Sequence, residues 1–389
     1  MKPASERQPR WPRRSTWALI AIASVAPFVY PLWLALRSHR RPDRKPPEPV
    51  ESQGLSVVVP AYRECEVIAA KVEDVRRNGY PGELEVLVVT EDTPTAEAAR
   101  QANAQVLNAA ERLGKAEAVN RGVTAARHPI VVITDADTRL APGSLAALAR
   151  WFGDPKVSAV AGEKRVEGTA EQIYWRFESW VKRRESLRGS TIGLVGELAA
   201  VRRSAFQQIP ADVIVDDLWM GLDVIEQGGA IRYEPQAIAI ERLSPGLWAS
   251  WERRTRTVAG LIDLLWRRRG LLVPWRSPVA VELWGHKLMR AVLGPLAHAA
   301  LVAQACASLH RSRIAAAFVI GHVVAACAFA RAAPTLPERF AARVLFLQAT
   351  GLGGTVRYLR GDRPAAWPKR ERPGASALVF RRAQSSAED

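Results

Sequence analysis

Two aspartates, Asp135 and Asp137, directly follow a run of β-branched residues at 130–134. Such an uninterrupted run predicts a buried β-strand. Because side chains alternate along an extended chain, the two carboxylates flanking Ala136 project the same way. Paired carboxylates at the carboxyl end of a strand suit Mg2+ or Mn2+, above all a cation that already carries phosphate oxygens. The alternative is an ordinary polar turn that closes a strand.

A glycine and a lysine, Gly114 and Lys115, lie upstream at the start of a segment with helical periodicity, 115–126. Glycine lets the backbone approach a ligand closely. A lysine near a helix start, where amide N–H groups also point outward, is well placed to meet a diphosphate. A diphosphate site here favours the metal interpretation of the two aspartates.

A second acidic pair, Asp216 and Asp217, opens a predicted helix at 216–227. Acidic residues at a helix N-terminus usually serve only as caps that interact with the free amides and the helix dipole. Behind a diphosphate motif and a metal motif, one of them is also a candidate general base.

Strands and helices alternate through the segment that contains these residues. Alternation of this kind predicts a mainly parallel sheet with helices on both faces. Ligands bind at the carboxyl ends of the strands in such sheets. The expected strands are 55–59, 85–89, 105–107, 130–134, 157–161 and closing strands within 230–240, and the longer expected helices are 66–77, 115–126, 169–188 and 216–227.

The bulk composition excludes several classes of protein. The chain has 389 residues, of which 48% are hydrophobic, enough for one large domain with additional segments or for two domains. Cys65, Cys306 and Cys327 form no closely spaced pair, which indicates neither a disulfide framework nor a zinc ribbon. The net charge of +16 could suit nucleic acid, but the basic residues crowd around apolar blocks and in the tails. That pattern is typical of a membrane protein, so we expect no nucleic-acid partner.

Apolar blocks near both ends predict membrane segments. Residues 17–36 have spanning length, with Pro27 and Pro31 as expected kinks. No small-residue cleavage site follows, so a retained anchor is favoured over a signal peptide. Residues 261–290 alternate apolar clusters with arginines, as interfacial helices do. The predicted organisation is a basic tail (1–14), an anchor (15–36), a linker (37–54), a soluble domain (55–260), interfacial helices (261–287), transmembrane or interfacial helices (288–358) and a second basic tail (359–389).

Taken together, residues 55–260 resemble the inverting glycosyltransferases of family two, and most of all their membrane-embedded branch of cellulose-synthase-like and hyaluronan-synthase-like enzymes. The resemblance rests on motifs that occur in the family's order. It implies an α/β GT-A fold, a Rossmann-like mixed sheet that binds a nucleotide sugar, together with transmembrane and interfacial helices.

The first two motifs lie at the ends of the first two expected strands. The run Pro60-Ala61-Tyr62-Arg63-Glu64 resembles the family's Pro-Ala-Tyr-Asn-Glu, so the resemblance implies that Pro60, Tyr62 and Glu64 line the nucleotide cradle. Arg63 replaces the usual Asn. The second motif implies an acidic contact to uracil from Glu91 or Asp92, and we favour Asp92.

The next two motifs supply the diphosphate and metal contacts. Gly114-Lys115-Ala116-Glu117-Ala118-Val119-Asn120 matches the family's Gly-Lys-x-x-Ala-x-Asn, which implies donor contacts from Gly114, Lys115 and Asn120. In the same way, Asp135 is expected to bind ribose and the divalent cation, and Asp137 the cation.

The last three motifs concern the acceptor and the reaction. The segment 193–203 resembles the family's acceptor-side Gly-x-x-x-Ala-x-Arg, and the position of Asp217 is that of the catalytic base. Arg256 matches an arginine that binds diphosphate, in the family's Gln-x-x-Arg-Trp. Thr257 replaces the acceptor-stacking Trp, which argues against cellulose-like processivity unless Trp248 or Trp251 takes its place.

The resemblance implies transfer of a sugar from a nucleotide sugar, expected to be a UDP-sugar, to a polysaccharide or other glycan, with Mg2+ or Mn2+ as cofactor. One base suffices for a single displacement with inversion, whereas a retaining hydrolase needs two carboxylates flanking the sugar. Alternatives are transfer to a lipid acceptor, such as a polyprenyl phosphate or a glycolipid, and a nucleotide-binding membrane scaffold without catalysis. The sequence names neither the sugar nor the acceptor.

The donor also decides the predicted topology, because basic residues flank 17–36 on both sides and cannot orient it. Nucleotide sugars are cytosolic, so the expectation is a multi-pass protein of the cell (inner) membrane with 55–260 in the cytoplasm. Segments 288–309 and 314–330 then cross outward and back. Segment 340–358 is expected to be interfacial or re-entrant, because the basic tail behind it is unfavourable to translocate.

Overall fold

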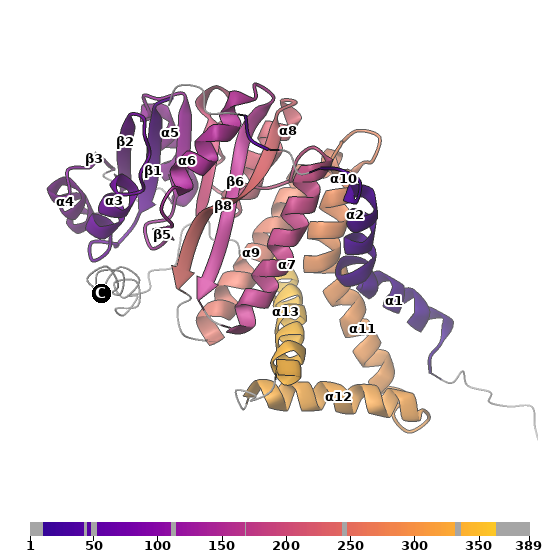
Figure 1. Cartoon of the computed structure of the whole chain (residues 1–389). Helices are drawn as coiled ribbons and strands as arrows, with labels where there is room; N and C mark the ends of the chain where they lie inside the picture. The colour runs from indigo at the N-terminus through magenta and orange to yellow at the C-terminus, as the bar shows by residue number, and fades with distance from the viewer. Residues whose placement is uncertain are drawn as a thin grey trace, which may run out of the picture. The chain divides into compact units, whose positions relative to one another are not determined.

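A mixed β-sheet forms the centre of one part of the protein (Figure 1). The computed structural model describes residues 11–42, 45–47, 53–109, 114–167, 169–242, 247–330 and 336–362. These residues divide into two compact units: a sheet-containing unit within 34–249, and a helical unit made of 11–33 and 250–362. We describe each unit by itself.

Within the described residues, eight strands follow the order β3-β2-β1-β4-β7-β6-β8-β5. Strands β3, β2, β1 and β4 are parallel to one another, whereas β7 runs antiparallel to both β4 and β6. The strands are β1 (Leu55–Ala61), β2 (Leu84–Thr90), β3 (Gln105–Asn108), β4 (Ile130–Thr134), β5 (Arg139–Leu140), β6 (Val157–Glu167), β7 (Leu198–Arg202) and β8 (Ala230–Arg242).

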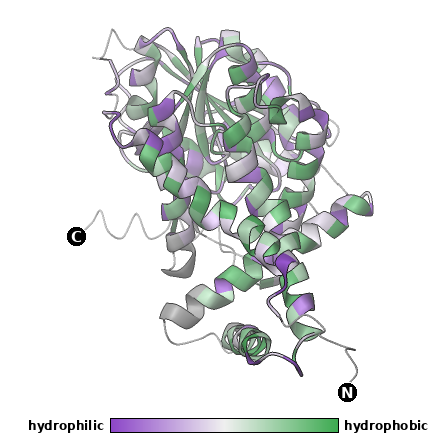
Figure 2. Cartoon of the chain, turned by 90° about the vertical axis from the view of Figure 1, so that its right-hand side faces the viewer, coloured by the Kyte–Doolittle hydropathy of each residue, from purple (hydrophilic) through white to green (hydrophobic). Residues whose placement is uncertain are grey.

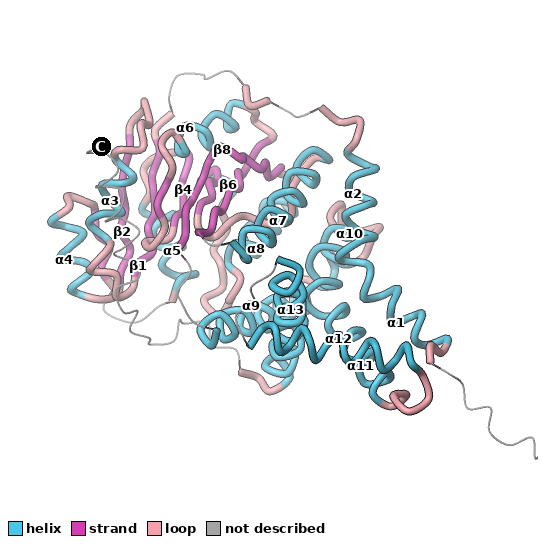
Figure 3. Tube along the Cα trace, turned by 60° about the horizontal axis from the view of Figure 1, so that its bottom comes forward, coloured by secondary structure: helices cyan, strands magenta, loops and turns pink. Residues whose placement is uncertain are grey.

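Helices cover both faces of this sheet, as predicted. Val57 and Val59 of β1 pack in one apolar cluster with Val72 of helix α3. Val58 points to the opposite face, where it lies against Gly122 of helix α5. Figure 3 shows these helices along the strands. The helices of this unit are α3 (Ile68–Arg76), α4 (Thr93–Gln101), α5 (Lys115–Ala125), α6 (Ser144–Ala149), α7 (Thr169–Arg188) and α8 (Asp216–Glu226).

The neighbours β1 and β4 mark the point where the strand order reverses, because β2 lies on one side of β1 and β4 on the other. Loops leaving the carboxyl ends of such a pair diverge and open a crevice for ligands. The predicted strand 130–134 has those bounds in the structure. Strands β6 and β8 are longer than predicted, because they pair with each other through polar residues across two register shifts.

The helical unit contains the predicted apolar segments. Among the described residues, Arg14–Ser38 and Ala280–Cys306 are long and apolar enough to cross a membrane, and Arg313–Ala328 is apolar but shorter. Figure 2 shows the hydropathy along these helices. The unit comprises α1 (Arg14–Ser24), η1 (Val25–Val29), the start of α2 (Tyr30–Ser38), most of α9 (Leu247–Arg267), η4 (Arg269–Leu272), α10 (Ala280–Glu282), η5 (Leu283–Leu293), α11 (Gly294–Cys306), α12 (Arg313–Ala330) and α13 (Leu336–Leu359).

Local irregularities in this unit follow the sequence. Pro27 lies in the π-helical turn η1, where the first long helix departs from α geometry, as expected for a residue without an N–H group. Helix α9 continues through Gly260, the predicted end of the soluble domain. Segment 340–358 lies within the single helix α13. The tail residues 1–10 and 363–389 lie outside the described residues, so the predicted location of the tail stays a prediction.

The close contact of α5 with β1 gives a stability prediction. A Cβ atom on Gly122 would lie 2.3 Å from Cγ1 of Val58, so Gly122→Val must overpack the core. Overpacking costs about 1–3 kcal/mol, and we expect the melting temperature of the detergent-solubilised chain to fall by about 2–10 °C. Arg121→Val introduces the same side chain at an exposed position of the same helix and is the matched control. Equal melting temperatures for the two variants would contradict the packing argument.

Candidate active site

The turn after β4 carries the first candidate residues. Asp135 and Asp137 are partly exposed, whereas Ala136 and Thr138 between and after them are buried. Residues 136 and 137 form a turn and not a continuation of the extended strand, so the alternation expected from the sequence does not by itself fix the direction of the two carboxylates. The Thr138 hydroxyl donates to the main-chain oxygen of Asp135 at 2.9 Å and closes the turn.

Lys115, the first residue of α5, reaches across to this turn. Its Nζ atom donates to Oδ1 of Asp135 at 2.7 Å. Gly114 precedes it with φ at +84°, a left-handed conformation that glycine adopts without strain. The amide of Gly114 donates to Oε1 of Glu91 at 2.8 Å, so the second and third sequence motifs are joined.

Asp92 joins the first motif to the second. Its Oδ2 accepts from the amide of Arg63 at 2.7 Å, and its Oδ1 accepts from the amide of Thr95 at 3.0 Å as the N-cap of α4. Burial alone would raise the pKa of Asp92, but these hydrogen bonds hold it below its usual range. Glu91 and Asp92 therefore each have a structural contact, and the predicted contact to uracil stays a prediction.

Arg63 adopts a left-handed backbone conformation, with φ at +57°. Asparagine, which the family motif has here, tolerates this conformation better than most residues. The arginine that replaces this asparagine therefore lies at a position where the backbone is left-handed. The hydrogen bond from the Arg63 amide to Asp92 helps to hold that conformation.

The acceptor-side segment and the second acidic pair meet Lys115 at Gly196. A Cβ atom on Gly196 would lie 3.4 Å from Nζ of Lys115 and 3.9 Å from Oδ2 of Asp217. Any larger residue would fill the space between the two charged groups. Asp217 is partly exposed at the start of α8, and its Oδ1 accepts from the amide of Leu218 at 2.8 Å.

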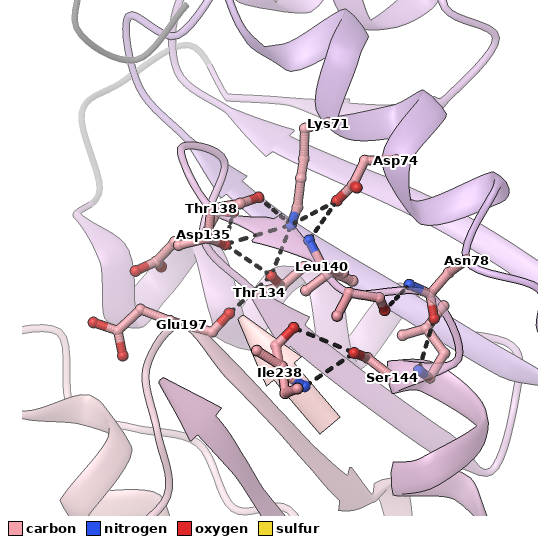
Figure 4. Close-up of polar contacts among 12 residues, drawn as sticks. Lys71, Asp74, Asn78, Thr134, Asp135, Thr138, Leu140, Ser144, Glu197 and Ile238 are labelled. Atoms are coloured by element: carbon pink, nitrogen blue, oxygen red, sulfur yellow. Dashed lines mark hydrogen bonds and ion pairs between the residues drawn. The ribbon is translucent and has the colours of Figure 1, made fainter. Parts of the chain in front are cut away.

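Sequence reasoning missed one charged residue of this region, Glu197. The antiparallel pairing of Thr134 with Leu198 brings Glu197 next to Asp135, and their side chains lie near each other in Figure 4. Glu197 forms an ion pair with the buried Lys164 of β6, and Lys164 also pairs with Glu241 of β8. The sequence does show Glu197 as an acidic residue inside the acceptor-side motif. Its ion-pair partner Lys164 is distant in sequence, so the motif alone does not reveal the contact.

The charges in this cluster change one another's pKa values. Burial alone would lower the pKa of Lys115, but Asp135, Asp216 and Glu197 raise it above its ordinary value. Burial raises the pKa of Asp135, with Glu197 and Asp137 adding to the effect and Lys115 opposing it. Burial would likewise raise the pKa of Glu197, but Lys164 and Lys115 lower it to about 2.

The remaining predicted residues lie in several places. Pro60, Tyr62 and Glu64 are partly exposed at and beyond the end of β1. Asn120 is buried, and its side chain exchanges two hydrogen bonds with the main chain of Ile209, at 2.8 and 2.9 Å. Arg256 belongs to α9 in the helical unit.

This chain is similar in sequence and fold to known proteins. Residues 56–210 match the family described as glycosyl transferase family 2. The poly-beta-1,6-N-acetyl-D-glucosamine synthase of Staphylococcus aureus (strain COL) is 25% identical over 234 residues, which are 56% of this chain and 57% of that protein. The corresponding synthase of Staphylococcus epidermidis is 24% identical over 232 residues, covering 55% of this chain and 56% of that protein. The chain thus spans little more than half the length of these curated relatives.

A solved structure is similar over most of the chain. The mannosyltransferase PcManGT from Pyrobaculum calidifontis, in complex with GDP-Man and Mn2+, superposes with a TM-score of 0.73 and 28% sequence identity. The alignment covers 90% of this chain and 99% of that one. The family and fold predicted from the motifs are confirmed: residues 56–210 are a glycosyltransferase family 2 domain, and the structural similarity shows a GT-A fold.

Proposed function

We propose that this protein transfers a sugar from a nucleotide-sugar donor to a glycan acceptor, with inversion, in polysaccharide biosynthesis at a membrane. The observation that carries the proposal is the meeting of Lys115, Asp135 and Asp217 around Gly196. The polysaccharide synthases among the relatives support a glycan as the acceptor.

The donor half of the site suits a nucleoside diphosphate. Lys115 at the start of α5 would meet the diphosphate together with the outward-facing amides of that helix. Pro60, Tyr62 and Glu64 would line the base and ribose. We expect a UDP-sugar, and the GDP-mannose complex of the archaeal mannosyltransferase makes a GDP-sugar the second candidate.

The residues present fit a divalent cation held partly by the donor. Within the described ranges, no group of three or more His, Cys, Asp or Glu side chains could hold a metal by itself. Mg2+ commonly binds one or two carboxylates and completes its shell with substrate phosphates and water, and Asp135 and Asp137 supply that number. A cation bound there would stabilise the negative charge on the departing nucleoside diphosphate. Mn2+ in the archaeal neighbour supports this proposal.

Asp217 is the proposed general base. It would take the proton from an acceptor hydroxyl as that oxygen attacks the anomeric carbon from the face opposite the diphosphate. Glu197 is another carboxylate of this cluster. With a pKa near 2 it stays ionised but is a weak proton acceptor. Asp217 is therefore the proposed base, at the position that the family resemblance implies, and one base suffices for a single displacement with inversion.

The acceptor could also be a lipid. The exposed Trp248 lies near the start of α9, and such a residue could stack on a sugar or lie in a membrane interface. Trp251 packs against Phe346 within the helical unit, with ring centroids 6.3 Å apart. It is therefore less available than Trp248 for stacking on an acceptor.

The apolar helices support a location in the cell (inner) membrane, and we propose a multi-pass protein. Because nucleotide sugars are cytosolic, the sheet-containing unit would face the cytoplasm. Membrane lipids would then be partners of the helical unit. The retained Lys115, Asp135, Asp137 and Asp217 argue against a scaffold without catalysis.

The proposed activity is tested by offering UDP- and GDP-sugars to purified membranes that contain the chain and measuring nucleotide release. We expect release that needs Mg2+ or Mn2+ and is lost in EDTA. Asp137→Ala should lower turnover at least about 100-fold, since a catalytic metal contributes several kcal/mol of transition-state stabilisation. The variant should still be found in the membrane. Full activity in excess EDTA would refute the metal requirement.

Asp217→Asn should abolish transfer and leave donor binding intact, because the base acts on the acceptor. General-base catalysis contributes about 100- to 10,000-fold, so we expect a kcat loss in that range with an unchanged Kd for the nucleotide sugar. Asp216→Asn is the matched control at the neighbouring position. If donor affinity falls in parallel with the rate, Asp217 is a donor ligand or a structural residue.

Lys115→Ala and Arg256→Ala should each weaken UDP binding by about 1–3 kcal/mol, the value of a charge-assisted contact. Isothermal titration calorimetry on the solubilised chain measures this change. Arg121→Ala removes an exposed positive charge from the same helix as Lys115 and controls for the general loss of charge. Unchanged affinity in both test variants would show that the diphosphate lies elsewhere.

A further inference from the structure

A fully buried lysine, Lys71 of α3, lies beside the turn that follows β4 (Figure 4). No sequence motif includes it. Its Nζ atom donates to Oγ1 of Thr134 at 3.0 Å and to the main-chain oxygen of Thr138 at 2.7 Å. Both threonines are themselves completely buried. The ammonium group thus contacts the turn at the residues on either side of the two aspartates.

Asp74, one helical turn further along α3, holds the same segment at a third point. Its Oδ2 lies 3.8 Å from Nζ of Lys71 and accepts from the amide of Leu140 at 2.8 Å. Lys71 and Asp74 therefore connect α3 to positions 134, 138 and 140. The segment after β4 is thus held by the fully buried ammonium group of Lys71 and the partly buried carboxylate of Asp74.

The same contacts extend to the acceptor side. The Thr134 hydroxyl, which accepts from Lys71, donates to the main-chain oxygen of Glu197 at 2.8 Å. Glu197 directly follows Gly196, the residue between Lys115 and Asp217. One ammonium group and one hydroxyl thus link the turn with the aspartates to the segment that enters β7.

An apolar side chain would satisfy the packing needs of this position without the cost of a buried charge. Burial lowers the pKa of Lys71 to about 8, although Asp74, Asp135 and Asp137 oppose that change. A buried cation is tolerated only where hydrogen bonds and counter-charges surround it, as they do here. The contacts made by the ammonium group, rather than its bulk, distinguish this residue from its apolar neighbours.

We propose that Lys71 is a positioning residue that holds the turn 134–138 so that Asp135 and Asp137 present their carboxylates to the divalent cation. This inference rests on the proposed function, because it requires those two aspartates to be the cation ligands. Lys71 does not contact the cation or the sugar. It acts through Thr134 and Thr138.

The test uses the full-length chain in detergent with UDP present and measures Mn2+ binding by the electron paramagnetic resonance of free Mn2+. Lys71→Met keeps an unbranched side chain one atom shorter than lysine and removes the hydrogen-bond donors. We expect Mn2+ affinity to fall at least about tenfold, the effect typical of losing a residue that orients metal ligands. Removing a positive charge near two carboxylates would by itself strengthen Mn2+ binding, so positioning and simple electrostatics predict opposite signs.

Two further variants keep the test decisive. Thr134→Val retains the shape of the side chain and loses the hydroxyl that joins Lys71 to Glu197, so it should also weaken Mn2+ binding even if Lys71→Met does not fold. Glu85→Gln disturbs a different buried polar cluster of the same sheet, in which Glu85 accepts from the amide of Arg127 at 3.0 Å. It should lower the melting temperature and leave Mn2+ affinity unchanged.

The outcomes separate this inference from the proposed function. If Asp137→Ala retains Mn2+ binding, the proposed metal site is wrong and the role of Lys71 falls with it. If Asp137→Ala loses Mn2+ while folded Lys71→Met and Thr134→Val bind Mn2+ as well as the parent chain or better, only the positioning role is overturned. Weaker binding in either of these two variants, with Glu85→Gln unchanged, supports it.

Discussion

The contact between Lys115 and Asp135 is the interaction on which the candidate site depends, because it joins the start of α5 to the end of β4. It requires β4 to lie beside β1, so that the chain leaving β4 faces the helix that packs on β1. Gly114 and Gly196 let two backbone segments approach the lysine from different parts of the sequence. Without this arrangement, Lys115, Asp135 and Asp217 would not lie close together in space.

Hydrogen bonds between main chain and side chain then hold the motifs in place. Asp92 holds Arg63, and Glu91 holds Gly114, so the loops after β1 and β2 support the start of α5. Beside the turn after β4, Lys71 has a comparable role from the helix side. The acidic residues of the second motif thus contribute to the architecture of the site, independently of any contact with a base.

Many of the strands and helices and several of the site residues could be predicted from the sequence, because they depend on patterns among neighbouring residues. The strand at 130–134 ends where its apolar run ends, and α5 begins at the lysine that the motif identifies. The contacts of Lys71 and Glu197 could not be predicted in this way, because they depend on pairings between residues more than thirty positions apart. The short β5 and the polar ends of β6 and β8 likewise form only through tertiary pairing, so hydrophobic periodicity does not reveal them.

The orientation of β7 has a consequence for how such a site could diversify. Because β7 runs antiparallel to β4, the chain enters β7 at the edge of the sheet where β4 ends. The candidate site is therefore bounded by loops leaving β1, β2 and β4 on one side and by an incoming loop on the other. Changes in length or composition at 189–195 can remodel the second boundary and leave the outgoing loops and their mutual hydrogen bonds intact. The outgoing loops and the incoming loop can then evolve as separable modules of a single sheet.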